Sequence, residues 1–182
     1  TGSVATFIIT GTTGKVTSDY GVVSVRSDGS AFELQGGTLV SNKGHTVENY
    51  SFGANKTITI SGGAIESKGG NGALHAGENS KLIVTGGKIT ASSAFAAIYA
   101  STGTEVSLKN VEINTTGMSN AVLFATNAAK VTLEDVKVTS DKKIFNASGK
   151  ANIEVKSGDY TFTGTSDYDK RNAIASSGDG TT

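Results

Sequence analysis

Apolar and polar residues alternate along short stretches of this chain, and the stretches recur at regular intervals. Residues 56–80 read KTITISGGAIESKGGNGALHAGENS, and the next segment, KLIVTGGKITASSAFAAIYASTG, repeats their pattern. Each segment has an alternating stretch, a Gly-Gly pair, a stretch around one central Ile, a polar loop and an Ala-rich stretch. A period of two residues is typical of a β-strand with one buried and one solvated face. The pattern therefore predicts three short strands in each repeat.

The repeat covers nearly the whole chain. The Gly-Gly pair occurs in three units. The first unit has Thr-Gly in its place, and the last three units have Asn-Val, Asp-Val and Ser-Gly. These copies begin at Thr13, Gly36, Gly62, Gly86, Asn110, Asp135 and Ser157. The intervals of 22–26 residues predict about seven units in a single domain, residues 1–182. Internal repeats of this length indicate solenoids, propellers or similar arrays.

The apolar positions show how the units cover one another. The first stretch carries the pairs Phe32/Leu34, Ile58/Ile60, Leu82/Val84, Val106/Leu108, Val131/Leu133 and Ile153/Val155. The third carries Tyr50/Phe52, Leu74/Ala76, Ile98/Ala100, Leu123/Ala125 and Phe145/Ala147. No unit can bury such a face alone, but stacked units can, because neighbouring strands lie about 4.8 Å apart. We therefore predict an all-β fold, a right-handed parallel β-helix of about seven coils with three short strands per coil.

Two other repeat architectures were weighed. The stretch VSLKNVEI, residues 106–113, is similar to a leucine-rich motif, but no unit contains a helix-forming run or a fixed Asn. Propeller blades need about 40 residues per repeat, which is more than these units contain. The β-helix agrees best with the pattern, and the leucine-rich repeat stays the alternative.

The units ALHAGENSKLIVTGGKIT and IYASTGTEVSLKNVEINTTG resemble the passenger domains of bacterial autotransporter proteins. These domains are similar in fold to pertactin-like and pectate-lyase-like β-helices. The resemblance implies a segment of a longer passenger that is secreted or displayed on the bacterial cell surface. It also implies binding to host cells or to sister bacteria. The motifs that carry it are structural rather than catalytic.

Composition and charge narrow the range of partners. The chain has no Cys, so it has no disulfide and no thiolate metal site. Lys plus Arg and Asp plus Glu both number 16, so no overall charge attracts nucleic acid. No apolar run approaches the roughly 20 residues of a membrane helix, so we expect no membrane insertion of this segment.

The sequence shows no constellation of catalytic residues. Paired carboxylates would serve a polysaccharide-cleaving β-helix, but the outward Glu33 and Glu154 are five coils apart, about 24 Å by the strand spacing. His45 and His75 each lack a second ligand at a spacing typical of metal sites. The tail 167–172, DYDKRN, is interpreted as a polar loop. We therefore expect no enzyme activity, no metal and no cofactor.

One surface stands out in the third strands. Residues between the inward positions should point outward and stack into an apolar stripe. They are Ala73, His75, Ala97, Tyr99, Val122, Phe124, Ile144 and Asn146. Exposed apolar patches with aromatic anchors mark interaction sites. We therefore expect a virulence or adhesion module that binds a host-cell surface protein or glycan through the lateral face of the helix. Self-association of bacteria, and binding or degradation of polysaccharide, are the alternatives.

Overall fold

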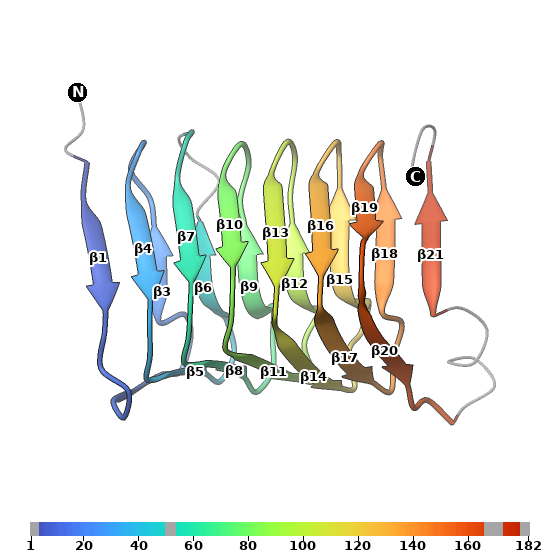
Figure 1. Cartoon of the computed structure of the whole chain (residues 1–182), viewed down its shortest axis with the longest axis horizontal. Helices are drawn as coiled ribbons and strands as arrows, with labels where there is room; N and C mark the ends of the chain where they lie inside the picture. Colours follow the sequence, from blue (N-terminus) through green and yellow to red (C-terminus); the bar gives the residue numbers. More distant parts are fainter. Residues whose placement is uncertain (1–3, 50–53, 166–172, 179–182) are drawn as a thin grey trace.

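The computed structural model describes residues 4–49, 54–165 and 173–178, which form three seven-stranded parallel sheets (Figure 1). The first sheet contains β1 (Thr6–Ile9), β4 (Ala31–Leu34), β7 (Thr57–Ile60), β10 (Lys81–Val84), β13 (Glu105–Lys109), β16 (Lys130–Glu134) and β19 (Asn152–Val155). The second contains β2 (Lys15–Ser18), β5 (Thr38–Ser41), β8 (Ala64–Ser67), β11 (Lys88–Ser92), β14 (Glu112–Thr116), β17 (Val136–Ser140) and β20 (Gly158–Phe162). The third contains β3 (Val23–Val25), β6 (His45–Asn49), β9 (Gly72–Ala76), β12 (Ala96–Ala100), β15 (Ala121–Thr126), β18 (Phe145–Ser148) and β21 (Ile174–Ser177).

Strands that follow one another in the chain lie in different sheets, and each strand pairs with the strand three places further on. This arrangement is a parallel β-helix with three strands per coil, as predicted. The described residues contain no helix, which excludes the leucine-rich alternative. It follows that none of these segments is a helix long and apolar enough to cross a membrane.

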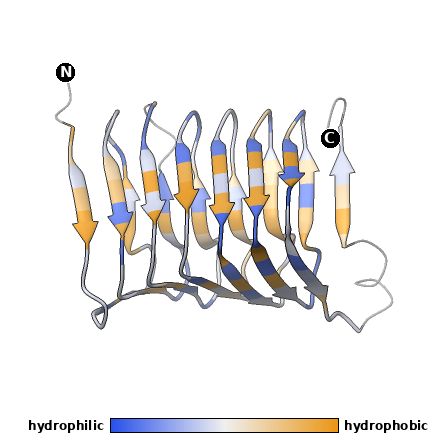
Figure 2. Cartoon of the chain, viewed as in Figure 1, coloured by the Kyte–Doolittle hydropathy of each residue, from blue (hydrophilic) through white to orange (hydrophobic). Residues whose placement is uncertain are grey.

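The alternating residues of the first sheet stack in register. Phe32 pairs with Ile58 and Leu34 with Ile60, and the same pairing continues through Val131 and Leu133. These side chains are at most 3% exposed, and Figure 2 shows the alternation on β13 and β16 as orange bands separated by a paler one. At the last coil, which no further described coil covers, Val155 is 45% exposed. The neighbouring coil is therefore what buries each inward residue.

The corner between the first and second sheets contains one residue with a positive φ in every described coil except the first. The second residue of each Gly-Gly pair has a positive φ, as at Gly63 with 78°. A Cβ atom on Gly63 would lie 2.6 Å from the carbonyl oxygen of Gly37 in the coil before. In two later coils the left-handed residue is instead the first of the pair, Asn110 or Asp135, each with φ of 53°, a conformation that Asn and Asp tolerate better than other residues. This explains why the Gly-Gly motif weakens without the corner being lost.

We expect Gly63→Ala to lower the free energy of unfolding by about 1–3 kcal/mol. The left-handed backbone costs a non-glycine residue roughly 1–2 kcal/mol, and the Cβ atom adds a backbone clash. Gly14→Ala is the matched control, because its Cβ would meet nothing within 4 Å and its φ is not positive. That control should stay within about 0.5 kcal/mol of the wild type in urea unfolding. Equal effects of the two substitutions would contradict this account of the corner.

Candidate binding surface

The structure divides the predicted third-strand stripe into two groups. His75 on β9, Tyr99 on β12, Phe124 on β15 and Asn146 on β18 are successive register partners. All four side chains are half-buried and lie on the outer face of the third sheet. Asn146 extends its amide nitrogen to the Asn120 side-chain oxygen at 2.7 Å. These four residues therefore form a continuous row across four coils.

The other four residues of the stripe are not exposed, so that part of the prediction was wrong. Ala73, Ala97, Val122 and Ile144 are at most 3% exposed and belong to the buried core. The strict alternation on which the prediction depended breaks at this point. Pairing between β12 and β15 passes from Ala96 opposite Ala121 directly to Ile98 opposite Leu123.

The equivalent residue of β6 shows where these side chains point. Thr46 precedes Val47 as Ala73 precedes Leu74, and its hydroxyl lies 2.7 Å from the Ser41 hydroxyl and 2.9 Å from the carbonyl oxygen of Glu66. Both partners belong to the second sheet, so Thr46 faces the inner corner. Two consecutive residues of β6, β9, β12 and β15 thus turn inward. The offset between paired strands stays constant across this point, so neither strand carries an extra residue, and the break in alternation moves the next outward position by one residue.

The outward side chains form a stack of flat rings, which we call the aromatic row: His45, His75, Tyr99 and Phe124. Successive ring centroids lie 4.7, 4.9 and 5.4 Å apart, with interplanar angles of 24°, 9° and 12°. Each ring covers the faces of its neighbours, so the ring edges point to solvent. Such pairs contribute about 0.5–1.5 kcal/mol each beyond the area they bury. The row therefore both stabilises the solenoid and presents a surface.

Phe95 completes this surface, and sequence reasoning missed it. It lies edge-on to Tyr99 at 5.9 Å and to Phe124 at 5.5 Å. Among the described large hydrophobic residues that are exposed, it is the one outside the end coils, with 36% exposure. The usable signal was a single large aromatic residue in a loop, SSAF, that otherwise consists of small residues and that the repeat pattern assigns to a polar connection.

The two histidines are not isolated, contrary to the sequence prediction. His45 on β6 lies opposite Gly72 on β9, and its ring stacks on the ring of His75. The Nε2 atom of His75 lies 2.9 Å from the Ser101 hydroxyl. Burial lowers the pKa of His45 to about 3, assisted by the neighbouring His75, and burial alone lowers the pKa of His75 to about 4. Both rings are therefore neutral at pH 7.

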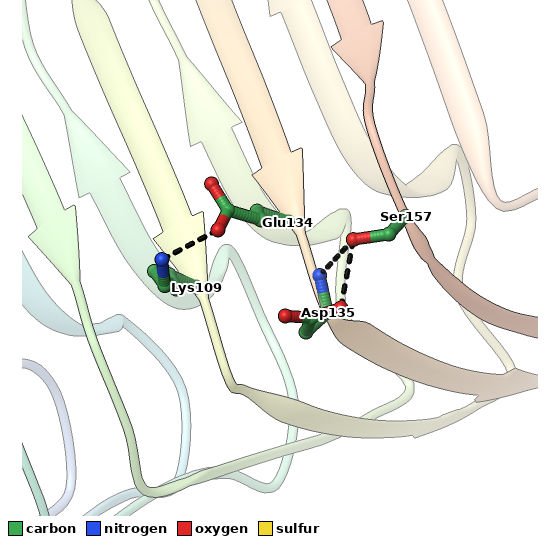
Figure 3. Close-up of polar contacts among 4 residues, drawn as sticks. All are labelled: Lys109, Glu134, Asp135 and Ser157. Atoms are coloured by element: carbon green, nitrogen blue, oxygen red, sulfur yellow. Dashed lines mark hydrogen bonds and ion pairs between the residues drawn. The ribbon is translucent and has the colours of Figure 1, made fainter.

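The acidic residues of the later coils have structural partners. Glu134 forms an ion pair with Lys109 of the coil before (Figure 3). Asp135 at the corner is held by Ser157, whose hydroxyl accepts from the Asp135 backbone N–H and donates to its carboxylate, both at 2.8 Å. Carboxylates fixed in this way hold coils together rather than forming an acid–base pair.

A shallow hollow of about 360 Å³ lies on the outer face of the first sheet. Its charged lining consists of Lys81, Glu105 and Lys130, and Lys81 and Glu105 form an ion pair at 3.1 Å. Glu33 and Glu154 lie on β4 and β19, five strands apart in this sheet, as the sequence indicated. The hollow thus offers one carboxylate, already paired. The predicted polar loop 167–172 lies outside the described residues.

The fold and this surface define the chain as a parallel β-helix with an aromatic row on one lateral face. Comparisons with protein-family models, curated proteins and solved structures found no match.

The histidines should make the protein sensitive to acid. Below about pH 6.5 the unfolded histidines bind protons, while the folded ones stay neutral until about pH 4 for His75 and about pH 3 for His45. The free energy of unfolding should therefore fall on acidification by up to about 1.4 kcal/mol per pH unit for each histidine. His75→Phe should reduce this slope in urea unfolding between about pH 6 and pH 4.5, while Tyr99→Phe should keep it. A wild-type slope in His75→Phe would show that His75 does not titrate in this way.

Proposed function

We propose that this chain is a binding module of a secreted or surface-displayed bacterial protein, and that it attaches to a protein receptor on a host cell. The observation that carries the proposal is the aromatic row with Phe95 on the lateral face of the third sheet. The resemblance of the repeat units to autotransporter passenger domains supports the location and the host-directed role.

The arrangement of the rings favours a protein partner over a sugar. Tyr99 lies between His75 and Phe124 with nearly parallel planes, so its faces are covered from both sides. Sugar rings pack on open aromatic faces, whereas exposed ring edges carry positive partial charge and contact aromatic faces or carbonyl oxygens. Such groups are abundant on protein surfaces. Tyrosine and other aromatic residues are also common anchors of protein interfaces.

The remainder of the described lateral surface is less suited to such contacts. In the first and second sheets, outward charges pair between coils, as Lys81 with Glu105 and Lys88 with Glu112. Exposed ion pairs of this kind contribute about 0–1 kcal/mol to stability. Because their charges are already paired within the chain, they offer few strong contacts to a partner. The charge balance of the whole chain is zero, so attraction by net charge does not assist binding. Contact through the aromatic surface therefore supports the proposal best.

The test is binding of labelled chain to live mammalian cells. The wild type should bind saturably, and a Tyr99→Ser, Phe124→Ser double variant should bind at least about tenfold more weakly, because each residue would be an interface anchor. The matched control is Ile83→Ser with Thr132→Ser, two half-buried outward positions of the first sheet. It should bind as the wild type does. Circular dichroism and thermal unfolding confirm that each variant is folded.

The outcomes separate the hypotheses. Loss of binding after protease treatment of the cells supports a protein receptor, while loss after glycosidase treatment supports a glycan. If the double variant binds cells as tightly as the wild type does, the aromatic row is not the contact surface, although the proposed function stands. No saturable binding by the wild type would overturn the host-cell proposal, and concentration-dependent light scattering would then favour self-association.

A further inference from the structure

The break in alternation within β6 brings two potential metal ligands to the same side of the strand. Thr46 and Val47 are both fully buried, so the outward residues on either side of them are His45 and Glu48. In a regular strand, residues three positions apart would face opposite sides. Here the imidazole and the carboxylate share the outer face of the third sheet.

The next coil supplies a third ligand. His75 on β9 is the register partner of Glu48, and Gly72 is the register partner of His45. The ring centroids of His45 and His75 lie 4.7 Å apart. One nitrogen of each imidazole and one carboxylate oxygen of Glu48 all lie within 4.8 Å of one another.

The hydrogen bonds of the histidines leave nitrogen lone pairs for a ligand. The Nδ1 atom of His45 is buried and has no hydrogen-bond partner, which is costly for a polar atom removed from water. His75 is held through Nε2 by the Ser101 hydroxyl, as outer-shell partners hold the imidazoles of metal sites.

We propose that His45, Glu48 and His75 form a binding site for one divalent transition-metal ion, with Zn²⁺ as the representative. Two imidazoles and one carboxylate are a ligand set that Zn²⁺ accepts, at about 2.0–2.2 Å from each ligand atom. A tetrahedral ion would bring these atoms to about 3.4 Å from one another. That requires the two stacked rings to rotate out of parallel, which half-exposed side chains can do. The remaining coordination position is open to water.

The site would link two coils. His45 and Glu48 belong to one coil and His75 to the next, so a bound ion would stabilise the folded chain relative to the unfolded chain, in which the ligands are far apart. The inference is independent of the proposed receptor binding, since it involves only the first two rings of the aromatic row.

The experiment is a titration of the whole chain, free of any histidine tag, with zinc chloride in a calorimeter. The wild type should bind one ion per chain. In a parallel NMR titration, the ¹⁵N resonances of both imidazoles should shift as zinc binds. His45→Ala, Glu48→Gln and His75→Ala should each raise the dissociation constant at least about tenfold. Glu66→Gln is the matched control, a half-buried outward carboxylate on β8, and should leave binding unchanged.

Glu48→Gln keeps the size of the side chain, so it tests the site even if a histidine variant fails to fold. Glu48→His, which replaces one zinc ligand by another, should retain binding. The proposal is overturned if the wild type gives no saturable heat and no imidazole shift. It is equally overturned if Glu48→Gln binds zinc as tightly as the wild type.

Discussion

Parallel pairing between neighbouring coils is the interaction on which the whole molecule depends. Each coil contributes three strands, and every strand inside a sheet is hydrogen-bonded to the equivalent strands of the coils before and after it. The same contacts that join the backbones also bury the side chains, because an inward residue is covered mainly by its equivalent one coil away. Where a coil has no described neighbour the residues are exposed, as with Phe7 at 62% and Ile174 at 67%. Burial and hydrogen bonding therefore increase together with each added coil.

Much of this arrangement could be read from the sequence, because the period of two residues and the repeated corners each have a single physical meaning. The pair Leu82 and Val84 is buried as expected, and the corner at Gly86 lies between β10 and β11. The failure came at Ala97 and its equivalents. Alanine is small enough for either face, so the sequence AAIYA gives no sign that Ala97 and Ile98 both turn inward. Strict alternation places Tyr99 outward correctly, but it cannot represent two consecutive inward residues.

The proximity of the histidines was hidden for a different reason. His45 and His75 are 30 residues apart, more than the usual length of a unit, so counting by the repeat does not align them. They meet because Thr46 and Val47 both turn inward, which brings His45 to the same outer face as Glu48, the register partner of His75. A contact that depends on a break in the strand alternation cannot be recognised from ligand spacing alone. The candidate metal site and half of the aromatic row share this origin.

The corner conformation also limits how such a chain can change in length. A single residue inserted within a strand would reverse the inward and outward faces beyond it and move the next corner residue from its left-handed position. An inserted segment of one whole coil would keep both, because its strands would find equivalent partners on either side. Insertions and deletions compatible with this fold therefore come in units of about one coil. Duplication of an entire repeat is the change that lengthens the molecule without rebuilding its core.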